Sequence, residues 1–85
     1  LYEDLKIKFP KILQSKSSIS VLDYIFKNPI FRNNKLRDHL DVSAPTSVRF
    51  VNKLVESKLL NIIEQPSGQK SGLYRFEALM KIVRI

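Results

Sequence analysis

The chain contains no cysteine and no tryptophan, only two glycines, and no long uninterrupted run of apolar residues. The absence of cysteine excludes disulfide bridges and thiolate metal sites, and it agrees with a protein of the reducing cytoplasm. Because a membrane-spanning helix needs a long apolar run, we expect no membrane partner. The chain also starts at Leu1 without a methionine, so we expect a fragment of a longer protein.

The composition predicts one small folded domain. Its hydrophobic fraction of 44% and charged fraction of 27% are close to the averages of globular proteins, which argues against disorder. The net charge of +7 is uneven, because basic residues outnumber acidic ones by seven to three between Lys27 and Lys58. Such an excess indicates a polyanionic partner, most often nucleic acid. The alternative is a solvated surface whose charge keeps the protein soluble.

The first thirteen residues have the apolar spacing of a helix. Leu5, Phe9, Ile12 and Leu13 recur three or four positions apart. Pro10 lacks a backbone N–H, so we expect the helix to kink or end there. We interpret residues 1–16 as a connecting helix from the parent protein and residues 17–85 as the domain.

Three further helices follow in the sequence. The first is expected over residues 19–27, and a two-turn helix over residues 34–40 with Asn33 as its cap. A three-residue break then leads to Ser43, which is expected to cap a longer helix over residues 44–57. A short turn carrying Ile30 and Phe31 separates the first two of these helices.

The longer helix has one apolar and one polar face, and strands follow it. Residues 59–64 and 72–77 are expected to form a hairpin around the polar loop 65–71, with Tyr74 and Phe76 directed into the core. The apolar residues of these elements predict one shared core, made of Leu22, Phe26, Leu36, Leu40, Val51, Leu54 and Leu60. The polar face of the longer helix carries Thr46, Arg49, Asn52, Lys53 and Glu56.

These elements predict a mostly α fold with a small β-hairpin, in the form of a winged helix-turn-helix with a three-helix core and a two-stranded wing. In such a fold the second helix of the motif enters the major groove of double-stranded DNA. We therefore expect Arg49 to bind guanine, Asn52 to bind adenine, and Thr46 to contact base edges. The expected phosphate contacts are Ser47, Lys53, Lys70 and Arg75.

Short motifs follow one another between residues 18 and 83. They are Pro29-Ile30-Phe31, Leu36, Leu40-Asp41-Val42-Ser43, Thr46-Ser47, Leu54-Val55-Glu56-Ser57-Lys58-Leu59-Leu60 and Leu73-Tyr74-Arg75-Phe76. This series resembles the C-terminal winged helix of bacterial Fic (filamentation induced by cAMP) family proteins. The resemblance implies a DNA-binding or transcription-regulating module.

The resemblance also implies an enzymatic parent. Fic proteins transfer AMP from ATP to a hydroxyl of a target protein (AMPylation), with a histidine base and a glycine-rich turn that holds phosphates. This chain has only Gly68, Gly72 and an isolated His39. We therefore expect no catalytic residue, no metal site, no cofactor and no enzymatic activity in this chain.

Three positions depart from the family pattern. Asp41 and Lys58 stand where such domains usually have a glycine in the left-handed conformation. Arg37 replaces a small residue of the first motif helix. If this helix packs as in the family, the Arg37 side chain extends past the second helix toward the DNA, so we add Arg37 to the expected phosphate contacts.

An alternative function is a protein–protein interaction module. The domain would then dock on the Fic catalytic domain within one chain, or pair two protomers as a homodimer, and so position the target. Residues 1–13 and 78–85 would supply its apolar interface. A continuous positive surface over Arg49, Lys53 and the hairpin would favour DNA over this alternative.

Overall fold

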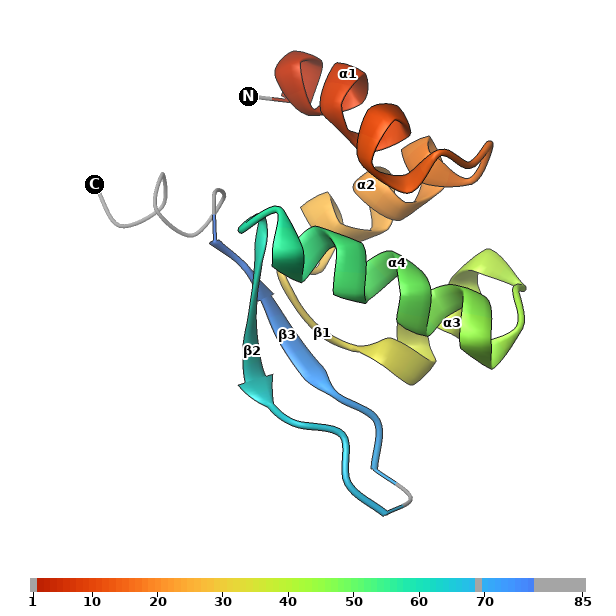
Figure 1. The fold of residues 1–85 in the computed structure, drawn as a ribbon, viewed down its shortest axis with the longest axis vertical. Helices are drawn as coiled ribbons and strands as arrows, with labels where there is room; N and C mark the ends of the chain where they lie inside the picture. The colour runs from red at the N-terminus through yellow and green to blue at the C-terminus, as the bar shows by residue number, and fades with distance from the viewer. Residues whose placement is uncertain (1, 69, 78–85) are drawn as a thin grey trace.

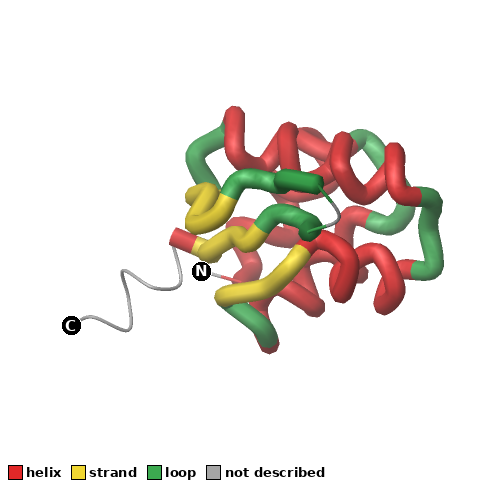
Figure 2. Tube along the Cα trace, turned by 90° about the horizontal axis from the view of Figure 1, so that it is seen from below, coloured by secondary structure: helices red, strands yellow, loops and turns green. Residues whose placement is uncertain are grey.

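The computed structural model describes residues 2–68 and 70–77, which form a layer of helices beside a small antiparallel sheet (Figures 1 and 2). The elements are α1 (Tyr2–Leu13), α2 (Ser18–Lys27), β1 (Ile30–Arg32), α3 (Asn33–Leu40), α4 (Ala44–Glu56), β2 (Leu60–Glu64) and β3 (Leu73–Phe76). The predicted mostly helical fold with a small sheet is confirmed. Over these residues, no helix has the length and apolar character needed to cross a membrane. Residues 78–85, expected to supply part of an apolar interface, lie outside the described residues.

The sheet has a third strand that the sequence did not predict. Its order is β1-β3-β2, so β3 is central, and Phe31 of β1 pairs with Tyr74 of β3. The two-stranded hairpin was therefore an incomplete prediction. Three residues are too few to show the alternating pattern of a strand, and β1 is defined only by its pairing with a distant part of the chain.

A single core joins the helices to the sheet. Its buried apolar residues are Leu5, Phe9, Leu13, Val21, Leu22, Ile25, Phe31, Leu36, Phe50, Val51, Leu54, Leu60, Tyr74 and Phe76. The predicted core is confirmed for five of its residues, whereas Phe26 and Leu40 are only partly buried and pack against the cluster. The core-facing positions of Tyr74 and Phe76 are confirmed as well.

A kink or an end of the helix was expected at Pro10, and α1 does not end there but runs on to Leu13. Proline removes one backbone hydrogen bond, but the final turn buries Leu13, which is only 1% exposed. Burial of a leucine side chain stabilises the fold by about 1.5–3 kcal/mol, which offsets much of this loss. Because Leu5, Phe9 and Leu13 belong to the shared core, α1 is part of the packed unit. Its role as a connection to a parent protein stays a prediction.

The predicted cap of α4 is confirmed, but that of α3 is not. Ser43 Oγ accepts a hydrogen bond from the N–H of Thr46 at the start of α4. Asn33 is instead the first residue of α3, and its buried Oδ1 has no partner among the described residues. Its backbone N–H donates to the carbonyl of Gly72. Strand pairing, rather than a side-chain cap, therefore fixes the start of α3.

Two non-glycine residues that follow helices have the left-handed conformation expected of them. Asp41 has a φ of 56° after α3, and Lys58 has a φ of 65° after α4. Lys58 N–H donates to the carbonyl of Val55, and Leu59 N–H donates to that of Leu54. These two bonds form a Schellman motif, in which glycine is the preferred residue at the position of Lys58.

We predict that Lys58→Gly increases the free energy of unfolding by about 0.5–1 kcal/mol, because glycine adopts a positive φ without steric cost. Urea unfolding followed by circular dichroism measures this change. Lys58→Ala is the matched control, since it removes the same charge but keeps a Cβ atom, which is strained at a positive φ. Equal stabilities of the two variants would contradict this explanation.

Candidate nucleic-acid interface

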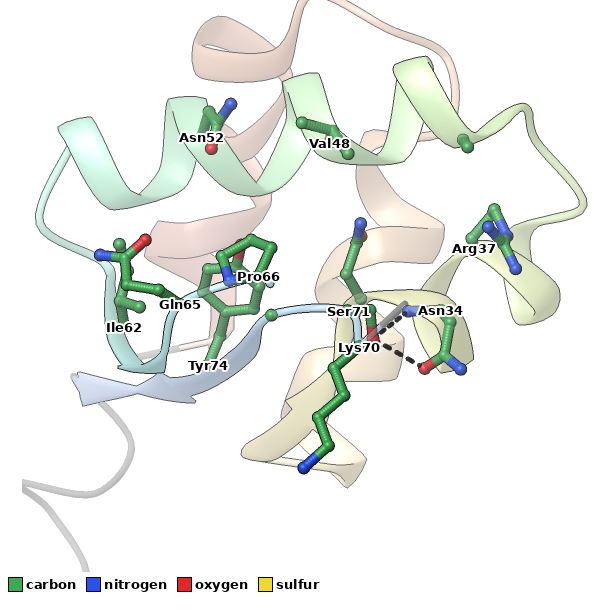
Figure 3. A pocket seen from close by; sticks show the side chains of 13 residues that line it. Asn34, Arg37, Val48, Asn52, Ile62, Gln65, Pro66, Lys70, Ser71 and Tyr74 are labelled. Carbon is green, nitrogen blue, oxygen red and sulfur yellow. Dashed lines mark hydrogen bonds between the residues drawn. The ribbon is translucent and has the colours of Figure 1, made fainter. Parts of the chain in front are cut away.

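An open groove of about 440 Å³ lies between α4, the first half of α3 and the β2–β3 loop (Figure 3). Its described lining residues are Asn33, Asn34, Arg37, Ala44, Val48, Asn52, Ile62, Gln65, Pro66, Lys70, Ser71, Gly72 and Tyr74. Arg37 and Lys70 make this lining positive, and it contains no acidic residue, although the chain has eight. Four carboxamides and one serine add hydrogen-bonding groups. This chemistry suits a polar anionic ligand.

Hydrogen bonds join the start of α3 to the base of the β2–β3 loop. Ser71 Oγ donates to Asn34 Oδ1 over 3.1 Å and accepts from the Asn34 N–H over 3.4 Å (Figure 3). The Arg32 guanidinium donates to the carbonyl of Ser71 over 3.0 Å. Two walls of the groove, from distant parts of the sequence, are thus held at a fixed spacing.

The tip of the β2–β3 loop is a tight turn. Ser67 and Lys70 exchange two backbone hydrogen bonds, of 3.2 and 2.9 Å, and Gly68 has a positive φ of 55°. Because both its backbone N–H and its carbonyl are hydrogen-bonded to Ser67, Lys70 is held at the rim of the groove. The tip projects from the end of the molecule opposite α1 (Figure 1).

Tyr74 and Gly72 form the wall on the side of the sheet. Tyr74 is only 3% exposed, and its burial raises the pKa of the phenol above its ordinary value. Its ring lies so close to Gly72 that a Cβ atom at residue 72 would be 2.6 Å from the Tyr74 hydroxyl oxygen. Glycine is therefore needed here because of this close approach.

The polar face of α4 is divided into two flanks and an outward edge. Val48 and Asn52 lie one turn apart and face the groove (Figure 3). Arg49 is exposed on the outward edge, with its guanidinium carbon 5.6 Å from the Phe50 ring centroid. The structure therefore places Asn52, Arg37 and Lys70 along one groove, which Arg49 does not line.

Thr46 and Lys53 lie on the other flank of α4. With 100° between successive helical residues, both are turned about 120° or more away from the midpoint between Val48 and Asn52. Thr46 Oγ1 is hydrogen-bonded to Ser43 Oγ over 2.8 Å, so its hydroxyl belongs to the helix cap. The predicted base contact of Thr46 is thus not on the groove side. Lys53 is half-buried, and its flank is separated from the groove by the outward edge.

Two expected phosphate contacts need correction. Ser47 is fully buried, and its hydroxyl donates to the carbonyl of Ala44 over 3.1 Å, so it has no surface for a phosphate. Arg75 alternates with the core-facing Tyr74 on β3 and lies on the opposite face of the sheet. Its guanidinium forms an ion pair with Glu77 over 2.9 Å. Sequence spacing did not give the direction of the Ser47 hydroxyl, whereas the outward direction of Arg75 agrees with the core-facing positions predicted for Tyr74 and Phe76.

The first turn of α4 also offers few backbone N–H groups to an anion. Pro45 has no N–H, while those of Thr46 and Ser47 are bonded to the side chain and the carbonyl of Ser43. Few donors are left in this turn for a phosphate.

Several groove residues were missed at the sequence level. Val48 is 42% exposed beside Asn52, and Ile62 of β2 is 40% exposed across the groove. The four-residue spacing to Asn52 was the available signal for Val48. Asn34, Gln65 and Ser71 had no comparable signal, because their positions depend on strand pairing and on the loop.

Residues 2–68 and 70–77 contain no group of three or more His, Cys, Asp or Glu side chains placed to hold a metal ion. Comparison of the chain with models of known protein families, with curated proteins and with solved structures found no match.

We predict that Gly72→Ala decreases the free energy of unfolding by about 1–3 kcal/mol, because the added methyl group overlaps the Tyr74 ring and forces it to move. Chemical unfolding measures the loss. In a Tyr74→Leu background the same substitution is expected to cost less, since the ring is gone. Equal costs in the two backgrounds would show that the close approach does not cause the effect.

Proposed function

We propose that this chain is a winged helix-turn-helix module that binds double-stranded DNA, with α4 in the major groove and the β2–β3 loop as the wing. The part of the groove lining that the structure describes, with two cations and no carboxylate, carries this proposal. The order of elements supports it, because α3, a three-residue break and α4 are followed by a hairpin beside α4. A recognition helix flanked by a basic loop is a common arrangement for DNA contact.

The side chains of α4 divide the task of recognition. Arg49 has the guanidinium fork that pairs with guanine, and Asn52 has the carboxamide that pairs with adenine. A helix in the major groove has a sugar–phosphate wall on each side. Arg37 and Lys70 would meet one wall, and Lys53 on the far flank would meet the other.

The acidic residues of the hairpin strengthen the proposal by their positions. Glu64 pairs with Arg32 over 3.3 Å, and Glu77 pairs with Arg75. Neither carboxylate lines the groove. Asp38 lies 3.7 Å from Arg37, but this exposed pair is weak, so Arg37 can exchange it for a phosphate.

The resemblance to Fic proteins supports a wider proposal. We propose that this module is the C-terminal regulatory domain of a Fic-type AMP transferase of the bacterial cytoplasm, whose catalytic residues would belong to a separate domain. In that arrangement this chain itself performs no chemistry. By binding DNA, the module would either bring the enzyme to a DNA site or regulate transcription from that site.

A second candidate is the protein-interaction module. Ile30 and Ile63 of the sheet are 51% and 48% exposed, and neither lines the groove. A protein surface of this kind would bind its partner with little dependence on salt, whereas DNA binding by basic residues depends on it strongly.

We predict that the chain binds mixed-sequence duplex DNA with an affinity that falls steeply as salt increases, because each neutralised phosphate releases counterions. Fluorescence anisotropy over a salt series measures the slope. Lys70→Ala, Arg37→Gln and Lys53→Ala are each expected to lower the slope by about one unit. Lys11→Ala on α1 is the matched control and should leave it unchanged. Absence of binding at low salt would reject the DNA proposal in favour of the interaction module.

We predict that Arg49→Ala weakens binding to a selected duplex by about 1–3 kcal/mol and relaxes the base preference at one position. Arg49→Lys is the informative companion, because it keeps the charge but loses the planar fork. It should preserve the salt slope and still lose the base preference. Selection from a randomised duplex library measures both, and an unchanged preference in Arg49→Ala would exclude base contact.

A further inference from the structure

Val48 is an apolar residue at a position where the fold does not require one. It is 42% exposed, while the core-facing residues around it, Ser47 and Val51, are fully buried. A β-branched residue on an exposed helix face is also a weaker helix former than alanine. The local structure and the core therefore do not explain a valine at this position.

The position of Val48 is nevertheless well defined. It lines the groove on the same flank of α4 as Asn52, one turn earlier (Figure 3). Side chains four residues apart on a helix are about 5–6 Å apart. Because base pairs stack about 3.4 Å apart along DNA, Val48 and Asn52 would reach neighbouring or next-neighbouring base pairs.

The chemistry of the major groove offers one apolar group, the C5-methyl of thymine. The remaining edges carry hydrogen-bond donors and acceptors, which a valine cannot satisfy. Resting on the proposed function, we propose that Val48 is a specificity-determining residue that packs on a thymine methyl group while Asn52 binds adenine. The module then prefers sites in which A·T pairs face this flank of α4.

The test uses two duplexes of equal length, one with alternating dA and dT and one with alternating dA and dU. They differ in the C5-methyl group alone, and every register offers an adenine to Asn52. Burial of one methyl group is worth about 0.8 kcal/mol, so the wild-type chain should bind the dT duplex about fourfold more tightly. Anisotropy competition at one salt concentration measures this ratio.

Two variants assign the preference to its residue. Val48→Ala should bind both duplexes equally, and its thermal unfolding should show that the fold is intact. Ile7→Ala is the matched control, because Ile7 is an exposed apolar residue of α1 (62% exposed) outside the groove. It should keep the wild-type ratio.

The outcomes separate this inference from the proposed function. Equal binding of the two duplexes by the wild type, with the salt dependence retained, overturns the role of Val48 and leaves DNA binding standing. A preference that survives in Val48→Ala also overturns it, since another group would then read the methyl. Absence of binding to either duplex at low salt overturns the proposed function and this inference with it.

Discussion

The pairing of β1 with β3 is the constraint on which the candidate site depends. It joins residues 30–32 to residues 73–75, and the contact continues beyond the strands. Asn33 N–H donates to the Gly72 carbonyl at one end, and Phe76 N–H donates to the Pro29 carbonyl at the other. Since α3 begins directly after β1, these bonds place its first turn against the base of the loop. Without them, Arg37 and Lys70 would not share a groove.

The same pairing organises the aromatic part of the core. Phe31 packs edge-on against Tyr24 at 6.0 Å between ring centroids and lies 5.9 Å from Tyr74. Phe76 contacts the rings of Phe9 and Phe26 in edge-to-face geometry. Such pairs add about 0.5–1.5 kcal/mol each beyond the area they bury. These contacts attach the sheet to α1 and α2. The outer face of α4 is therefore not needed to hold the sheet in place.

The two faces of the sheet also sort the charges of the chain. The outer face carries the ion pairs of Arg32 with Glu64 and of Arg75 with Glu77. The groove on the inner side keeps cations without carboxylates. Two of the fifteen lysines and arginines, Arg37 and Lys70, thus line a groove whose described lining has no carboxylate, and a polyanion would sense this local positive charge. The groove is positive because the carboxylates of the hairpin lie on the other face of the sheet, more than because of the number of lysines and arginines that line it.

The sequence by itself determined the helices, most of the core and the hairpin, because these depend on local periodicity and on caps. The spacing of Leu22, Val51 and Leu54 was enough to place them inside, and Ser43 before Pro45 was enough to begin α4. The left-handed positions of Asp41 and Lys58 followed from a family pattern.

The tertiary structure alone decided which polar residues share a surface. Helical spacing separates the flank of Asn52 from the flank of Lys53, but only packing decides which flank borders the groove and that the Ser47 hydroxyl is buried. Strand β1 depends on hydrogen bonds between residues more than forty positions apart. Such pairings leave no periodic trace in so short a segment, so the groove could not be read from the sequence.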